Sequence, residues 1–301
     1  MNSITPRLII IGASGLIGWE LFSAATQAGC RVLGTYADHA KPGLVRFDIR
    51  TDSLLNLVPD LGPLDTVYML SAFSNPSWVY QHPEEARALN VTATRALIDT
   101  VSAVGGRLVF MSSVEVFDGL VGGYSEASSP APLNLYGRMK LEIEQYVEGL
   151  SSPFCIVRTS WNVGWSTTQR CVVKLTYDTL LAAGARMAHD NTFSIADSRD
   201  TAAGLLALAS HPAVKRLHLA SSQTLIRTEL ADLIIATSRR AAEMAYTPTT
   251  FASIPYTEPR ARLNHLDCSW ATTQLGLRFR PAVDIIRDKV RLLDAPAPSA
   301  A

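Results

Sequence analysis

Residues 7–18 read RLIIIGASGLIG, and this stretch decides the fold. RLIII is an almost continuous β-branched run, which is typical of a central parallel strand that is buried on both faces. Gly12, Gly15 and Gly18 follow with G-x-x-G-x-x-G spacing, and residues 15–29 carry apolar side chains at helical spacing. Glycines in such a strand–turn–helix unit let the backbone approach a pyrophosphate, whose charge the start of the helix stabilises. The stretch therefore predicts a dinucleotide-binding loop.

Strands continue to alternate with helices over about the first 150 residues, which predicts an α/β fold with a parallel sheet and helices on both of its faces. Beyond Arg158 the pattern weakens. We expect residues 161–170 to form a loop and residues 295–301 a flexible tail. The expected strands are 30–33, 45–47, 66–70, 108–111, 154–157 and 217–219, and the expected helices are 83–104, 134–150, 228–237 and 283–293.

The composition excludes several classes of protein. The chain has 301 residues, of which 48% are hydrophobic and 18% charged, so it is not a disordered chain. Lys and Arg together number 27, as do Asp and Glu, so no basic excess favours nucleic acid or an anionic membrane as a partner. No apolar run approaches the roughly 18 residues that span a bilayer, and the N-terminus does not resemble a signal peptide. We expect a cytoplasmic protein.

The four cysteines, Cys30, Cys155, Cys171 and Cys268, are too far apart in sequence for a CxxC pair. They are expected to be free thiols in a reducing compartment. No metal site is expected.

The end of the second strand bears on the choice between NADP and NAD. Thr35 and Tyr36 are not acidic, whereas an acidic residue there would hold the ribose hydroxyls of NAD. His39 and Lys41 can reach a 2′-phosphate, although Asp38 could turn toward the ribose instead. The stretch favours NADP, with NAD as the alternative.

A tyrosine and a lysine stand four residues apart in Tyr136-Gly137-Arg138-Met139-Lys140, so on a helix they share one face. A phenol ordinarily titrates near pH 10, and a neighbouring ammonium, together with the positive nicotinamide ring, favours the phenolate and lowers that pKa. Ser113 follows the strand 108–111 at its carboxyl end, where ligands bind in open parallel sheets. Its hydroxyl could hold a substrate carbonyl oxygen.

These motifs carry a resemblance to a known family. GASGLIG (12–18), VFMSS (109–113) and YGRMK (136–140) resemble the extended short-chain dehydrogenase/reductase superfamily. Further stretches resemble the dTDP-4-dehydrorhamnose reductase family, and together the resemblance covers nearly the whole chain. They are SSVEVFDG (112–119), YSE (124–126), PLNLYG (132–137), VRTSW (157–161) and GL (276–277).

The resemblance implies a Rossmann-type doubly wound parallel sheet with a smaller mixed C-terminal substrate domain. The expected dinucleotide-binding domain is 1–160, completed by about 186–222, and the expected substrate-binding region is 161–185 with 223–294. By motif position, Tyr136 would donate a proton, Lys140 would activate it and bind the ribose, and Ser113 would hydrogen-bond the carbonyl oxygen.

The resemblance also implies roles for residues at the strand ends. Asp48 would contact adenine, and Ser71 and Ala72 would flank the nicotinamide. Asn90 matches an asparagine in the helix below the site, with a helix-bend or capping role as its alternative. The expected cofactor contacts are Gly12, Ser14, Gly15, Leu16, Ile17, Gly18, Tyr36, His39, Lys41, Asp48, Ile49, Ser71, Ala72, Asn90, Ser112, Tyr136 and Lys140.

The second half of the chain offers fewer candidates for substrate binding. Trp161 could stack on a base or cover a sugar, or else pack in the core. Arg260 could pair with a diphosphate, since a guanidinium matches phosphate oxygens in a bidentate geometry, or else lie on the surface. The expected substrate contacts are Phe73, Ser113, Glu115, Trp161, Asn162 and Arg260.

The chain departs from its family at Ser113-Val114-Glu115, where the reductases usually have Thr-Asp-Tyr. Sugar-nucleotide 4,6-dehydratases resemble Thr-Asp-Glu at this place, with the aspartate as acid and the glutamate as base. Val114 cannot protonate a leaving hydroxyl, which disfavours a dehydratase. Glu115 is expected either to contact substrate or to be solvated at the edge of the site.

Taken together, the residues predict an NADP-dependent reductase that transfers hydride to a keto group, foremost the 4-keto group of a nucleotide-activated sugar. Its partner would be this small molecule, with a homodimer as a further expectation. The alternatives are a non-catalytic NADP-binding regulatory subunit and a nucleotide-sugar epimerase or dehydratase.

Overall fold

Seven parallel strands form the large sheet in the computed structural model of the chain, which describes residues 6–295. Their order is β10-β6-β5-β4-β1-β2-β3, so the chain starts in the middle of the sheet and winds outward to both edges. This is the doubly wound Rossmann-type arrangement that was expected. The strands are β1 (Arg7–Ile11), β2 (Arg31–Tyr36), β3 (Val45–Arg46), β4 (Thr66–Met69), β5 (Arg107–Ser113), β6 (Phe154–Thr159) and β10 (Arg216–Leu219).

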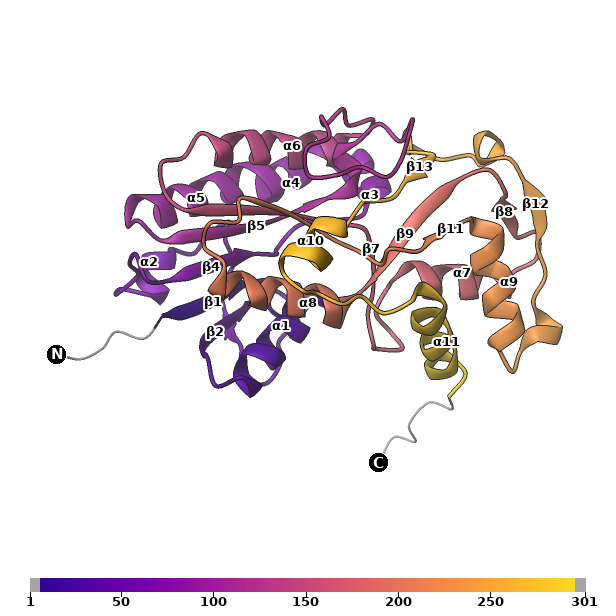
Figure 1. The fold of residues 1–301 in the computed structure, drawn as a ribbon, viewed down its shortest axis with the longest axis horizontal. Helices are drawn as coiled ribbons and strands as arrows, with labels where there is room; N and C mark the ends of the chain where they lie inside the picture. The colour runs from indigo at the N-terminus through magenta and orange to yellow at the C-terminus, as the bar shows by residue number, and fades with distance from the viewer. Residues whose placement is uncertain (1–5, 296–301) are drawn as a thin grey trace.

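The side chains of alternate residues of β1 pack into two hydrophobic cores, one on each face of the sheet. Ile9 and Ile11 pack toward α2–α6, whereas Leu8 and Ile10 pack toward α1, α8 and α10. In Figure 1, α4, α5 and α6 cover one face of the sheet, and α1 and α8 cover the other. The helices are α1 (Leu16–Gln27), α2 (Leu54–Leu57), α3 (Pro76–Gln81), α4 (Pro83–Arg87), α5 (Thr94–Ala103), α6 (Leu135–Glu148), α8 (Ser198–Ala207) and α10 (Ser269–Gln274).

The helix expected at 83–104 contains an irregularity. A π-helical segment, Ala88–Ala93, joins α4 to α5. Such segments widen a helix locally and occur often at functional sites.

A smaller mixed sheet lies at one end of the large one (Figure 1). Its central strand β9 pairs in parallel with β7 and β13 and antiparallel with β11, while β8 and β12 form a separate parallel pair. Three helices cover this part with their own core. The elements are β7 (Trp161–Val163), β8 (Arg186–Ala188), β9 (Thr192–Asp197), β11 (Thr224–Leu225), β12 (Thr247–Thr249), β13 (Leu263–Asn264), α7 (Val172–Leu180), α9 (Arg227–Thr237) and α11 (Ala282–Leu293), with short 3₁₀ turns at Val114–Val116, Leu208–Ser210, Ala241–Glu243 and Phe251–Ser253.

Two expectations for the second half differ from the structure. Residues 161–170 are not all loop, because Trp161–Val163 forms β7 against Ile195–Asp197 of β9, a partner too distant in sequence to leave a local signal. Residues 186–222 were expected to complete the large sheet, and only part of them do. β10 joins the large sheet and α8 packs on one of its faces, but β8 and β9 belong to the smaller sheets. Of the expected tail 295–301, residues 296–301 lie outside the described residues.

Within residues 6–295, no helix combines the length and the apolar character that crossing a bilayer requires.

Candidate active site

A cavity of about 670 Å³ opens at the carboxyl ends of β1, β4, β5 and β6 and extends to the smaller sheet. The large sheet with its loops and covering helices contributes Gly12, Ser113 and Tyr136, and the smaller sheet and its helices contribute Phe193 and Arg227. This is the end of an open parallel sheet at which ligands bind, and the volume suits a small-molecule site.

The glycine loop forms one end of this cavity. Gly12 has φ of +85°, and a Cβ there would lie 2.9 Å from the backbone nitrogen of Ser71. A Cβ on Gly18 would lie 2.3 Å from the carbonyl oxygen of Gly12, so neither position accepts a side chain without a shift of backbone. The Thr35 hydroxyl accepts a hydrogen bond from the Gly12 amide at 3.2 Å and so ties the loop to β2.

The start of α1 fits a phosphate group. Its N-cap is Gly15, and no side chain caps the first turn, which leaves the free N–H groups of the helix N-terminus for a ligand. Gly12, Gly15, Leu16, Ile17 and Gly18 all line the cavity. The loop therefore has the close backbone approach and the helix start that a dinucleotide pyrophosphate needs.

The residues expected at the adenosine end do not line this cavity, and two of them have protein partners. The Asp48 carboxylate accepts hydrogen bonds from Arg50 at 2.7 and 3.0 Å, which lowers the pKa of Asp48. The Lys41 Nζ lies 4.6 Å from the centroid of the Trp19 ring, and burial lowers the pKa of this lysine. The expected residues that do not line the cavity are Ser14, Tyr36, His39, Lys41, Asp48, Ile49, Ser71, Phe73 and Asn90.

Helix α6 brings Tyr136 and Lys140 to the cavity wall. Asn134 caps the helix, since its Oδ1 accepts a hydrogen bond from the Gly137 amide at 2.9 Å. Gly137 lets the helix touch the neighbouring backbone, because a Cβ there would lie 2.0 Å from the Glu115 carbonyl oxygen. The sequence PLNLYG thus fixes how closely the helix approaches the end of β5.

Ser113, Tyr136 and Lys140 meet as expected. Burial and the charge of Glu115 raise the pKa of Tyr136, and only a hydrogen bond with Ser113 lowers it. The Lys140 Nζ donates to the Met111 carbonyl oxygen at 2.8 Å and lies 5.8 Å from the centroid of the Tyr136 ring. Burial lowers the pKa of Lys140 itself to about 8. Lys140 is not among the groups that shift the pKa of Tyr136 here, so the expected lowering by its ammonium together with the nicotinamide ring stays a prediction.

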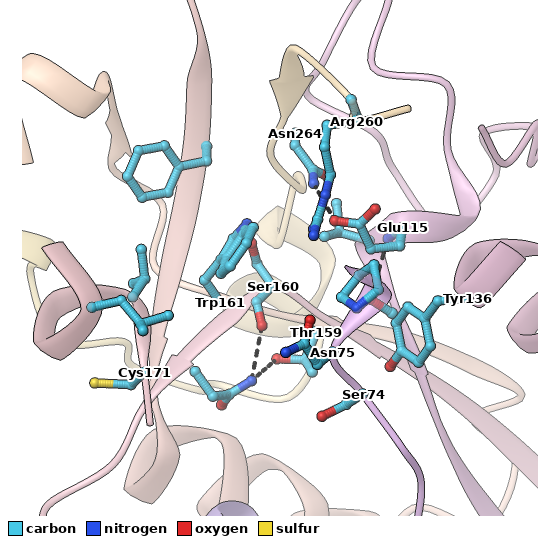
Figure 2. Close-up of a pocket in the computed structure, with 18 of the residues that line it drawn as sticks. Ser74, Asn75, Glu115, Tyr136, Thr159, Ser160, Trp161, Cys171, Arg260 and Asn264 are labelled. Carbon is cyan, nitrogen blue, oxygen red and sulfur yellow. Dashed lines mark hydrogen bonds between the residues drawn. The ribbon is translucent and has the colours of Figure 1, made fainter. Parts of the chain in front are cut away.

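Glu115 lines the cavity and is shielded from bulk solvent. It is 6% exposed, and its two carboxylate oxygens accept hydrogen bonds from Asn134 Nδ2 at 2.6 Å and Asn264 Nδ2 at 3.0 Å. Figure 2 shows Asn264 and Arg260 beside Glu115, with Tyr136 on the neighbouring wall. Asn264 had no motif that could have singled it out.

Asn90 lies in the π-helical segment and acts on the backbone after β4. Its Oδ1 accepts a hydrogen bond from the Phe73 amide at 2.9 Å, and its Nδ2 donates to the Phe73 carbonyl at 3.0 Å. The Phe73 ring packs on Trp78, with centroids 4.3 Å apart, so it does not line the cavity as expected. Ala72 and Ser74 on either side of it do line the cavity.

Three expected substrate residues also line the cavity: Trp161, Asn162 and Arg260. The Asn162 Nδ2 already donates to the Thr159 hydroxyl at 2.9 Å, which holds the start of β7. The Arg260 side chain is 12% exposed, so it is no ordinary surface arginine, and it pairs with Glu258.

The comparisons with known proteins agree with this geometry. Residues 6–291 match the protein family described as the RmlD substrate binding domain. The chain is 28% identical to dTDP-4-dehydrorhamnose reductase of Mycobacterium tuberculosis over 285 residues, 91% of this chain and 90% of that one. It is 32% identical to methionine adenosyltransferase 2 subunit beta of Rattus norvegicus over 148 residues, 49% of this chain. The match spans only 44% of that relative's length.

Solved structures share the fold at low sequence identity. A dTDP-4-dehydrorhamnose reductase of Clostridium acetobutylicum superimposes with a TM-score of 0.81 at 20% identity, covering 96% of this chain and 100% of that one. The corresponding reductase of Bacillus anthracis, in complex with NADP, gives 0.78 at 20% identity and covers 96% and 99%. MoeE5 in complex with UDP-glucose and NAD gives 0.77 at 20% identity and covers 95% and 98%.

The doubly wound sheet, the glycine loop and the cluster of Ser113, Tyr136 and Lys140 define a protein of the extended short-chain dehydrogenase/reductase type. More narrowly, the chain belongs to the RmlD substrate binding domain family, which its match over residues 6–291 establishes.

Proposed function

We propose that this protein is an NADP-dependent reductase that transfers hydride to a keto group of a nucleotide-activated sugar, foremost its 4-keto group. The observation that carries the proposal is the shared cavity: Ser113, Tyr136 and Lys140 line the same space as the glycine loop. The similarity over nine-tenths of the chain to a dTDP-4-dehydrorhamnose reductase supports the choice of substrate class.

In this proposal each side chain of the cluster has one task. Tyr136 gives its proton to the substrate carbonyl oxygen, and Ser113 donates a hydrogen bond to the same oxygen. The raised pKa of Tyr136 keeps the phenol protonated at neutral pH, which suits a proton donor. Lys140 would bind the ribose of the cofactor, and the bound NADPH supplies the hydride.

The preference for NADP rests on the end of β2. Thr35 and Tyr36 are not acidic, and Lys41 is near. Arg50 adds a guanidinium at this place that the sequence reading missed, and it interacts with both Asp48 and Asp38. NADP is the ligand of the Bacillus anthracis reductase, and NAD that of MoeE5.

The test is NADPH oxidation with nucleoside diphosphate 4-keto sugars. Wild-type protein should consume NADPH, and Tyr136→Phe should lower the rate by about 100- to 10,000-fold, the usual range for a lost acid. Tyr146→Phe is the matched control, since Tyr146 stands on the same helix but bonds the exposed Asp99 outside the cavity. Equal rates for Tyr136→Phe and wild type would reject the mechanism.

A second candidate is a non-catalytic NADP-binding regulatory subunit, which the similarity to methionine adenosyltransferase 2 subunit beta favours. The two candidates predict different results. A regulatory subunit would bind NADPH tightly, turn over no carbonyl compound in a panel, and be unaffected in cofactor binding by Tyr136→Phe.

A dehydratase remains disfavoured, because Val114 is buried and has no proton to give. An epimerase would copurify with its NAD and show no net oxidation. The division into a dinucleotide-binding and a substrate-binding domain, the cytoplasmic location and the homodimer stay predictions. Limited proteolysis, cell fractionation and light scattering would test them in turn.

A further inference from the structure

We propose that Arg227 binds the phosphate groups of the substrate and thereby restricts the enzyme to phosphorylated, nucleotide-activated substrates. This inference deepens the proposed function and rests on it. Neither a motif nor the resemblance pointed to Arg227.

Arg227 is the first residue of α9, and its side chain lines the far end of the cavity. The guanidinium carbon lies 4.6 Å from the centroid of the Phe193 ring and 5.3 Å from that of Trp161. Its Nη1 reaches the Thr176 hydroxyl at 3.5 Å, the limit of a hydrogen bond. Aromatic faces and one long contact thus hold the group in place while leaving most of its donors unused.

No carboxylate within residues 6–295 forms an ion pair with Arg227. The buried Arg158 pairs with Glu144 at 2.6 Å and Arg260 with Glu258, and the buried Arg107 donates to the Leu208 and His211 carbonyl oxygens instead. Burial lowers the pKa of Arg227; Tyr256 acts in the opposite direction, and the charge of Arg260 again lowers the pKa. A partly desolvated guanidinium without a carboxylate of its own is unfavourable, so this site is suited to an anion.

The charged side chains that line the rest of the cavity also favour an anion. Its one lining carboxylate within the described residues is that of Glu115, which two amides already bind. Five cationic side chains also line the cavity, as do Trp161, Phe193 and Phe251, whose aromatic rings suit a base or a sugar. A nucleoside diphosphate supplies both the anion and the ring that this lining would accept. The cationic side chains are Lys140, Arg170, Arg186, Arg227 and Arg260.

Calorimetric binding of UDP, dTDP and inorganic pyrophosphate, without turnover, tests the assignment. Arg227→Met should weaken the binding of both nucleotides by about 10- to 100-fold, the loss typical of charge-assisted hydrogen bonds. Arg227→Lys should restore part of it, because it keeps the charge but not the bidentate geometry. The affinity for NADPH should not change.

Arg262→Met is the matched control, since Arg262 is close in the chain to Arg260 but donates to the Asp190 carbonyl outside the cavity. Unaltered nucleotide binding by Arg227→Met, or no binding by wild type, would overturn the inference. If Arg227→Met loses nucleotide binding because it misfolds, it should lose NADPH binding at the same time. In that case the nucleotide affinity of Arg227→Lys decides whether the inference holds. If wild type binds UDP or dTDP through Arg227 but reduces no keto sugar, the proposed function fails and the phosphate site stands.

Discussion

Gly137→Ala should separate the catalytic helix from the end of β5. The added Cβ would lie 2.0 Å from the Glu115 carbonyl oxygen, whereas ordinary contact begins at 3.4 Å, so the backbone must yield by about 1.4 Å. A misplacement of about 1 Å can cost on the order of 100-fold in rate. We therefore expect kcat for NADPH oxidation to fall about 100-fold, and the free energy of unfolding in urea to fall by about 1–3 kcal/mol, as overpacking does.

Gly149→Ala provides the control on the same helix. Its Cβ would meet nothing closer than the Tyr146 carbonyl oxygen at 3.4 Å, and its φ of −78° is helical. This variant should keep its rate and lose no stability. If Gly137→Ala matched Gly149→Ala in both measurements, the close approach would not be what positions Tyr136.

Three further predictions concern groups around the site. Burial lowers the pKa of Lys140 to about 8, so the side chain is charged below that pH and loses its charge above it. We therefore expect kcat/KM to fall as the pH rises through about 8. The pH profile of Lys140→Arg should lack this decline, because arginine keeps its charge. Asn90→Ala leaves both backbone groups of Phe73 without their partner, and should lower the free energy of unfolding by about 1–3 kcal/mol in urea titrations; an unchanged midpoint would contradict the role of this side chain. Glu144→Gln leaves the buried Arg158 charge without its partner and should lower the free energy of unfolding by about 3–5 kcal/mol, more than the same change at the partly exposed Glu142.

The pKa shifts in the site give the glutamate a role that the sequence left open. Glu115 stands where related reductases have a tyrosine, and its charge raises the pKa of Tyr136. The buried carboxylate therefore helps to keep the phenol protonated at neutral pH, the state in which Tyr136 holds its proton in the proposed mechanism.

The first half of the fold could be predicted because its signals are local. A buried strand, a glycine turn and a helix follow one another within residues 7–29. The spacing of apolar residues predicts the strand and the helix, and the glycines predict the turn between them. The same holds for Tyr136 and Lys140, which one helix places on one face. Asn90 could be singled out from its motif, but its hydrogen-bond partner, the backbone of Phe73, could not be predicted from the sequence.

Only the tertiary structure decided the substrate end of the cavity. β7 exists because β9, some thirty residues later, supplies its hydrogen-bond partners. Glu115 is buried and bound because Asn264 reaches it from 149 positions away. Arg227 is a candidate site because Phe193 and Trp161 lie against it and no carboxylate of residues 6–295 pairs with it. Local sequence sets backbone conformation, but the burial and pairing of a charge depend on whatever the folded chain brings beside it.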